Sequence, residues 1–118
     1  MKFNCTSCGV CCRNLGKLLE YYRSGKAGQR KDYLRILAEE FPYRTNKRGA
    51  CEKLTKDNLC SVYPDRPTLC NIKKIFELYP QAAKTEKDWY ILNAMSCNAM
   101  MRQAKVAPIF YITKPFIQ

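Results

Sequence analysis

The sequence contains no histidine among its 118 residues. This absence excludes a Ser-His-Asp catalytic set and the mixed Cys-His ligand sets of many zinc sites. Any zinc or iron–sulfur site in the chain must therefore be held by cysteine alone, or be completed by a carboxylate, a water molecule or a bound ligand.

Long apolar runs are missing as well. No stretch of eighteen or more apolar residues occurs, so no membrane span is expected. The first residues, MKFNC, contain no apolar segment of the kind that a signal peptide needs. The sequence therefore predicts a cytoplasmic protein. Thiols stay reduced in that compartment, which favours metal binding, whereas four disulfides are the alternative in an oxidising one.

Acidic residues are few, with ten Asp and Glu against 21 Lys and Arg and a net charge of +11. The acids Glu52, Asp57 and Asp65 are scattered and not paired for general acid–base chemistry. Neither G-x-G-x-x-G nor G-x-x-x-x-G-K-[ST] occurs, so no nucleotide site is indicated. We therefore predict no catalytic residues and an acidic macromolecular partner, either protein or nucleic acid.

What the chain has instead is cysteine. Four of its eight cysteines lie within residues 5–12, in two overlapping C-x-x-C steps that end in a doubled cysteine. Two such thiolates on a tight turn can bind one metal ion, and Gly9 suits the turn because it adopts positive φ without steric cost. The candidate metal ligands are Cys5, Cys8, Cys11, Cys12, Cys51, Cys60, Cys70 and Cys97.

Apolar spacing predicts a mainly α fold in one small metal-stabilised domain, residues 1–118, with an irregular cysteine-rich knuckle at 1–12. Helices are predicted over 13–23 and 29–41, and Pro42 ends the second. The apolar stripe of the second helix is expected to pack in the core.

A short hairpin is predicted next, because the turn sequence at 56–58 separates two apolar segments and would bring Cys51 beside Cys60. Thr68 is the predicted N-cap of a helix that contains Cys70.

Thr85 is the predicted cap of the longest helix, at 86–105, which carries Cys97 and a core anchor, Trp89. The apolar tail at 109–112 is expected either to dock on the domain or to contact a partner.

These motifs resemble those of the CxxCxxCC family of zinc- or iron-chelating domains, also called YkgJ-type cysteine-cluster proteins. The matching patterns are F-x-C-x-x-C-G-x-C-C-R at 3–13, C-x-x-L at 51–54 and C-S-V-Y-x-x-R-P-x-x-C at 60–70. Val62 stands where the family usually has isoleucine. The resemblance covers about residues 3–75, with Cys97 as the late cysteine, and it implies metal binding.

Some longer proteins that carry this domain resemble flagellin lysine N-methylase, which is associated with an iron–sulfur cluster. The present chain is much shorter than those proteins and lacks their additional region. Methylation is therefore not an expectation here.

The eight sulfurs divide most simply into two closed Cys₄ sites, which are typical of structural zinc. Because the side chains of adjacent residues diverge, Cys11 and Cys12 are expected to face different sites, or one of them binds metal while the other packs. One [4Fe–4S] cluster with four remaining thiols is the alternative. Arg13 and Arg66 lie next to cysteines in the motifs, so they are either donors to thiolate sulfur or ordinary surface residues.

Three functions remain open on this basis. The leading hypothesis is a metal-binding protein that acts as a small binding or assembly module. The second is an iron–sulfur component of a protein-modifying or redox enzyme. The third is a basic zinc protein that binds nucleic acid through residues such as Lys47, Arg48, Lys73 and Lys74.

Overall fold

Five α-helices supply most of the regular structure in the computed structural model, which describes residues 1–118. They are α1 (Val10–Arg13), α2 (Leu15–Arg23), α3 (Asp32–Glu39), α4 (Ile72–Leu78) and α5 (Glu86–Gln103). Single 3₁₀ turns lie at Gln29–Lys31, Tyr63–Asp65, Thr68–Cys70, Pro80–Ala82 and Pro108–Phe110. The predicted mainly α fold is confirmed.

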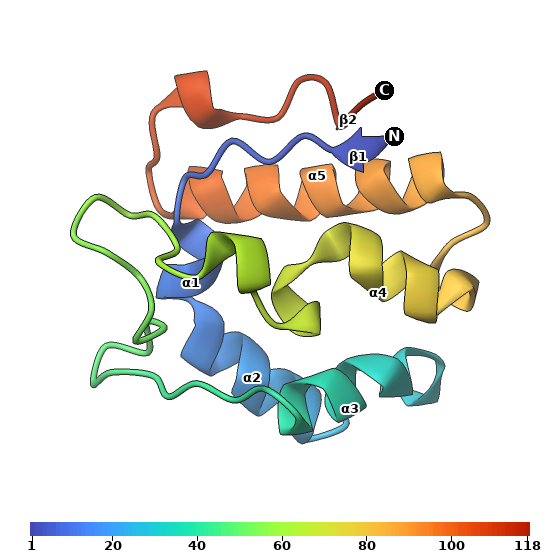
Figure 1. Ribbon diagram of the computed structural model, residues 1–118, viewed down its shortest axis with the longest axis horizontal. Coiled ribbons are helices and arrows are strands. Elements are labelled where there is room, and N and C mark those ends of the chain that lie inside the picture. The colour runs from blue at the N-terminus through green and yellow to red at the C-terminus, as the bar shows by residue number, and fades with distance from the viewer.

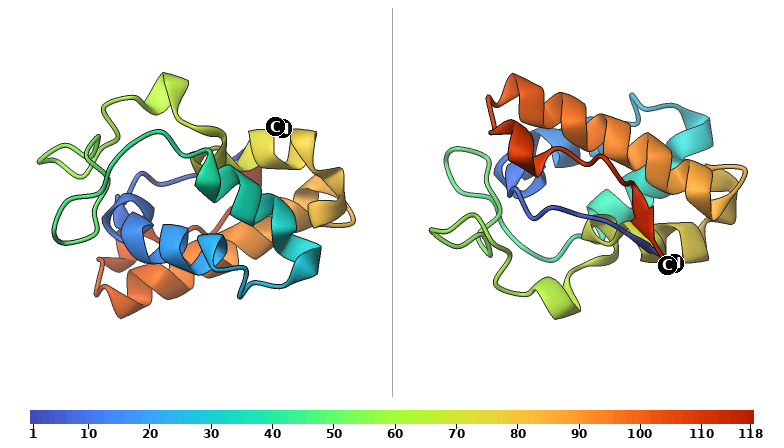
Figure 2. Two further views of the ribbon diagram at one scale, coloured as in Figure 1. Left: turned by 90° about the horizontal axis from the view of Figure 1, so that it is seen from below. Right: turned by 90° about the horizontal axis from the view of Figure 1, so that it is seen from above.

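Helix α5 is the longest helix and lies between the terminal segments and α4 in the view of Figure 1. The two terminal segments lie along one side of it, and α4 lies on the other, with α2 and α3 beyond (Figures 1 and 2). Strands β1 (Lys2–Phe3) and β2 (Phe116–Ile117) pair antiparallel, so the two ends of the chain meet. None of the helices is both long and apolar enough to cross a membrane.

The predicted core residues of α3 and α5 are buried. The apolar stripe on α3 and just beyond it is inaccessible to solvent along its length, at Tyr33, Leu34, Leu37, Ala38 and Phe41. Trp89 on α5 is 8% exposed, and its indole Nε1 donates a hydrogen bond of 2.7 Å to the carbonyl of Ile72. Trp89 therefore anchors α5 to the start of α4, as predicted.

The helices in the first part of the chain are divided differently from the prediction. Helix α1 begins at Val10, so Cys11 and Cys12 are helical and the irregular knuckle ends at Gly9. Asn14 leaves helical geometry, with φ −101° and ψ 9°, and separates α1 from α2.

The predicted cap at Thr68 was wrong. Residues 68–70 form a separate 3₁₀ turn, and the extended Asn71 caps α4 by accepting a hydrogen bond from the Lys74 N–H. The predicted cap of α5 is confirmed, because the Thr85 hydroxyl accepts a bond of 3.1 Å from the Asp88 N–H.

The hairpin predicted between positions 51 and 63 is reduced to an isolated antiparallel bridge between Leu54 and Cys60. The turn is present, with the Thr55 N–H bonded to the Leu59 carbonyl at 2.8 Å, but no strands extend from it. A second bridge joins Thr45 to Cys51. The chain between α3 and α4 therefore consists of loops and two 3₁₀ turns (Figure 1), and the two-stranded sheet lies at the termini instead.

The apolar tail docks only in part. Ile112 is 6% exposed and packs with Val10, Ala94 and Met101, whereas Ile109 is 86% exposed. The tail forms a 3₁₀ turn at Pro108–Phe110 and no strand, contrary to its β-prone composition.

Two close backbone approaches hold the cysteine-bearing loops against α1 and α2. The Gly16 N–H donates to the Gly49 carbonyl at 2.8 Å, and a Cβ on Gly16 would lie 3.0 Å from the Gly49 Cα. Gly9 has φ +78°, and a Cβ there would lie 2.7 Å from the Asn58 carbonyl oxygen. Glycine is needed at these points because a larger residue would push the loops away.

Gly9→Ala is predicted to destabilise the fold more than Gly25→Ala. Both glycines have nearly the same positive φ, +78° and +77°, but a Cβ at Gly25 meets nothing within 4 Å. We expect Gly25→Ala to cost about 1–2 kcal/mol from backbone strain, and Gly9→Ala roughly 1–3 kcal/mol more from the clash with Asn58. Urea denaturation measures both. Equal losses would contradict the close approach of Gly9 to Asn58.

Candidate metal centre

The eight cysteines reach the same region from separate parts of the chain. Cys5 and Cys8 lie in the irregular N-terminal segment, and Cys11 and Cys12 lie on α1. The remaining four come later, at Cys51 and Cys60 in the loops, Cys70 at the end of a 3₁₀ turn, and Cys97 on α5. None of them forms a disulfide.

One group of sulfurs gathers around α1 and α5. Burial raises the pKa of Cys97 to about 12, and the neighbouring thiols that add to this shift are Cys11, Cys5 and Cys8. Burial also raises the pKa of Cys5, with added repulsion from Cys11 and Cys8. We refer to this group as the outer set; its members are Cys5, Cys8, Cys11 and Cys97.

A second group gathers between α1 and the loops. Burial raises the pKa of Cys70 to about 12, and repulsion from Cys11, Cys51 and Cys60 adds to the shift. Burial likewise raises the pKa of Cys51, which interacts with Cys60. The backbone supports this group, because the Cys51 N–H donates to the Cys12 carbonyl at 2.9 Å. We refer to this group as the inner set; its members are Cys12, Cys51, Cys60 and Cys70.

Cys11 and Cys12 connect the two sets. A hydrogen bond between their side chains lowers the pKa of Cys11 and raises that of Cys12. Cys12 otherwise interacts with Cys70 and Cys60, whereas Cys11 interacts with Cys5 and Cys97 as well as Cys70. The doubled cysteine therefore supplies one sulfur to each set and keeps the sets adjacent.

One sulfur in each set accepts a backbone hydrogen bond from two residues further along the chain. The Ser7 N–H donates to the Cys5 Sγ at 3.3 Å, and the Lys53 N–H donates to the Cys51 Sγ at 3.4 Å. These bonds lower the pKa of both thiols against the effect of burial. Such donors stabilise a thiolate, which is the form of cysteine that binds metal.

The donor chemistry of both sets fits zinc or iron, which thiolates bind well. As the side chains lie in this structure, no three Cys, Asp or Glu residues place their donor atoms close enough around one point to hold a metal ion. Sulfur position depends on χ1, so rotation between staggered rotamers, with small shifts of the loops, is needed to close either set.

Arg66 lies between the inner and outer sets. Its Nε donates to the Cys70 carbonyl at 3.0 Å and its Nη1 to the Tyr63 carbonyl at 2.9 Å, while the guanidinium stacks 4.1 Å from the Tyr63 ring centre. Its charge acts to lower the pKa of Cys5, Cys11 and Cys70. The remaining N–H groups of the guanidinium are available to thiolate sulfurs.

Arg13, the other arginine beside a cysteine, has a buried Nε with no hydrogen-bond partner. A buried donor without an acceptor costs about 1–3 kcal/mol.

A family model described as "CxxCxxCC: Putative zinc- or iron-chelating domain" matches residues 4–98. The chain belongs to the CxxCxxCC family. The match spans all eight cysteines, so it includes the loops and most of α5 as well as the N-terminal motif. The predicted membership is confirmed. We found no significant match to the chain among curated proteins or among solved structures.

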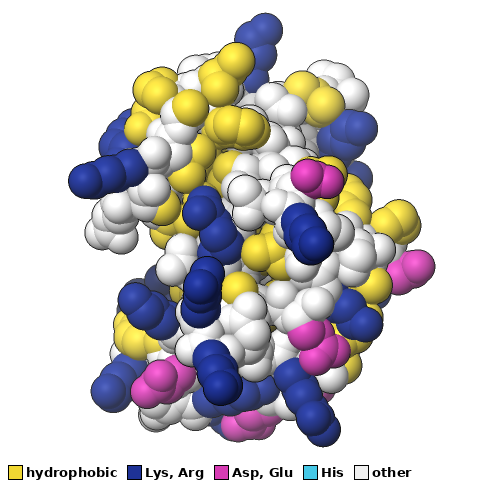
Figure 3. Space-filling model, turned by 90° about the vertical axis from the view of Figure 1, so that its left-hand side faces the viewer, with side chains coloured by type: hydrophobic (Ala, Val, Ile, Leu, Met, Phe, Trp, Pro, Cys, Tyr) yellow, Lys and Arg dark blue, Asp and Glu magenta, His cyan; other side chains and the backbone are white.

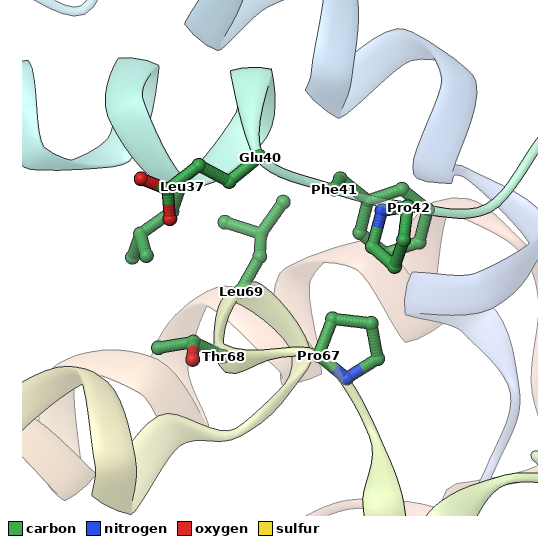
Figure 4. A pocket seen from close by; sticks show the side chains of 7 residues that line it. All are labelled: Leu37, Glu40, Phe41, Pro42, Pro67, Thr68 and Leu69. Atoms are coloured by element: carbon green, nitrogen blue, oxygen red, sulfur yellow. The ribbon is translucent and has the colours of Figure 1, made fainter.

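One pocket of this CxxCxxCC domain lies between α3 and the turn at 67–69, and no cysteine lines it. It has a volume of about 190 Å³ and is lined by Leu37, Glu40, Phe41, Pro42, Pro67, Thr68 and Leu69. Figure 4 shows Leu69 pointing from its turn toward the end of α3. The volume is below the roughly 300–1,000 Å³ typical of ligand pockets. This pocket is therefore a packing gap between α3 and the turn at 67–69.

Sequence reasoning missed the residues that position the loops of the CxxCxxCC domain. The Asn46 Oδ1 accepts hydrogen bonds from the Arg48 and Ala50 N–H groups, which closes the turn that presents Gly49 to Gly16. Asn58, with φ +61°, packs against Gly9. The N-x-x-G pattern at 46–49 was a readable turn signal, but nothing in the sequence shows which residues a turn will contact.

Arg66→Ala is predicted to lower the free energy of unfolding by about 1–3 kcal/mol, because two carbonyls lose a charged donor. The exposed Arg30→Ala is the matched control and is expected to change stability by less than about 0.5 kcal/mol. Urea denaturation measures both. Arg66→Lys should recover only part of the loss, since one ammonium cannot replace the planar fork. Equal stability of the Arg66 and Arg30 variants would contradict this role.

Proposed function

We propose that this CxxCxxCC domain binds two zinc ions, one in each set of cysteines, and acts as a small binding or assembly module. The observation that carries the proposal is the division of eight thiols into two neighbouring sets of four, assembled from both halves of the chain. Four thiolates around one ion are the usual arrangement of structural zinc. Membership of a zinc- or iron-chelating family supports metal binding in general.

Iron is the alternative metal, and it would connect the domain to the redox or protein-modifying enzymes considered above. Thiolates bind both metals, and backbone donors such as the Ser7 and Lys53 N–H groups suit either. Colour separates the two readings. Protein purified without air is expected to be colourless if it holds zinc and brown if it holds an iron–sulfur cluster.

A binding role suits the site better than catalysis. Two closed Cys₄ sites would leave no coordination position for water or substrate, which a catalytic zinc ion ordinarily keeps. The pocket at 67–69 is too small to serve as a substrate site. The metal would then serve to fix the loops and helices of the domain in place.

The charge of the molecule supports an acidic partner, either protein or nucleic acid. Only Arg35 forms ion pairs, with Asp32 and Glu39 at 2.8 Å each, so no acidic side chain neutralises the other basic ones. Figure 3 shows many Lys and Arg side chains on one face of the molecule, with fewer acidic ones among them. Lys73 is not among the available cations, because its Nζ donates to the Met1 carbonyl at 2.7 Å.

Removing metal is predicted to unfold the protein. Because ligand geometry rarely exists in an unfolded chain, the binding free energy of a structural zinc ion, on the order of 10 kcal/mol, becomes folding free energy. A chelator added under reducing conditions should abolish most of the helical circular dichroism signal and lower the melting temperature. An unchanged melting curve after complete metal removal would contradict the proposal.

Cys60→Ser tests whether Cys60 is a zinc ligand, and Ser61→Ala is the matched control. Both residues lie in the same loop, and Ser61 is exposed with no hydrogen bond from its side chain. Cys60→Ser should lower the zinc content by about one ion per chain, whereas Ser61→Ala should leave it unchanged. If both variants keep the full metal content, Cys60 is not a ligand.

A further inference from the structure

We propose that the two sets of cysteines have different tasks. The outer set exchanges its metal ion with molecules outside the protein, and the inner set keeps its metal ion as part of the core. This inference rests on the proposed function, since it assigns separate behaviour to the two sites proposed there. It follows from how differently the two sets are covered by the rest of the fold.

The inner set is built into the hydrophobic core. Cys51 is 7% exposed and belongs to a buried cluster with Leu15, Leu19, Ala38 and Phe41. Cys12 and Cys70 pack against the same cluster, and Cys60 is half-buried. The cluster joins α2 to α3 and to the end of the loop after α3. An incoming molecule can therefore reach the Cys51 sulfur only if α2, α3 and the loop separate.

The outer set lies at the surface. Cys5 and Cys11 are exposed, while Cys8 and Cys97 are half-buried beside the small cluster of Val10, Ala94, Met101 and Ile112. The N-terminal segment that carries Cys5 and Cys8 has no regular structure between β1 and α1. Cys5 and Cys11 can therefore be approached from solvent without disturbing the core.

Three hydrogen bonds to the C-terminal tail hold the N-terminal segment in place. The Thr6 hydroxyl donates to the Phe110 carbonyl, the Asn4 amide donates to the Lys114 carbonyl at 2.9 Å, and the Asn4 N–H donates to the Pro115 carbonyl at 3.0 Å. All three acceptors lie in the C-terminal tail, which is itself largely exposed. Local opening free energies range from near zero in such segments to the global stability in core elements. The outer set therefore opens by a small local motion, and the inner set only by partial unfolding.

The exchange is a ligand substitution without redox change. A chelator or an incoming thiolate takes Zn²⁺ from the outer set, and the four released thiolates take up protons from water. Where iodoacetamide is present, each free thiolate instead forms a thioether and releases iodide. Arg66 places a positive charge near Cys5 and Cys11, which favours the approach of an anionic ligand.

The test uses the full chain loaded with Zn²⁺ alone under anaerobic reducing conditions and then freed of reductant. Excess chromogenic chelator and iodoacetamide are added together, and zinc release, alkylation of each cysteine and helical signal are followed with time. One zinc equivalent should leave first, about tenfold or more faster than the second, because local opening costs less than partial unfolding. Cys5 and Cys11 should be alkylated in the fast phase, and Cys51 and Cys70 in the slow phase. Helical signal should fall only in the slow phase.

A pair of neighbouring variants gives a second, independent arm. Cys11→Ser and Cys12→Ser alter adjacent positions of α1. Cys11 belongs to the outer set and Cys12 to the inner set. Cys11→Ser should abolish the zinc released in the fast phase. The zinc released in the slow phase and the helical signal should be retained. Cys12→Ser should lower the thermal stability of the protein and the amount of zinc released in the slow phase. If Cys12→Ser does not fold, the release kinetics of the unaltered protein still decide the proposal.

Two results would overturn the inference: release of both ions at one rate, or alkylation of Cys51 or Cys70 before Cys5 and Cys11. Each of them leaves the binding of two zinc ions intact. Binding of a single zinc ion, or of none, would instead overturn the proposed function. The two failures are therefore distinguishable in one experiment.

Discussion

The arrangement of the cysteines depends on one backbone contact, between the start of α2 and the loop that follows α3. Gly16 approaches Gly49 so closely that a Cβ on Gly16 would lie 3.0 Å from the Gly49 Cα, and the Cys51 N–H donates to the Cys12 carbonyl nearby. These two interactions join the N-terminal cysteine motif to the loops that carry the later cysteines.

That contact also explains why the two sets differ in burial. It places Cys12 and Cys51 against the cluster formed by α2 and α3, so the inner set shares the core with Leu15, Leu19 and Phe41. Cys11, one residue away, remains exposed on α1. Apolar burial raises the pKa of the thiols and disfavours thiolates. Metal binding compensates for this cost by making the thiolate the bound form.

The sequence predicted the parts of the fold that depend on local patterns. The α3 stripe, the Trp89 anchor and the Thr85 cap could be read from spacing and residue type. The break at Asn14 was not predicted, and the cap at Asn71 was missed although asparagine is a preferred N-cap residue.

The pairing of the two termini and the docking of Asn58 on Gly9 are contacts between remote segments, for which a single sequence has no signal. The candidate ligands were evident from cysteine spacing. How they divide into sets was not, because that depends on the paths of the loops. The expected divergence of Cys11 and Cys12 was the one available clue.

Zinc K-edge X-ray absorption on the zinc-loaded protein, combined with metal analysis, tests the account most directly. We predict two zinc ions per chain, each surrounded by four sulfur atoms at about 2.3 Å and by no nitrogen or oxygen ligands. A single ion per chain, or a first shell that contains oxygen or nitrogen, would contradict the division of the eight cysteines into two all-sulfur sites.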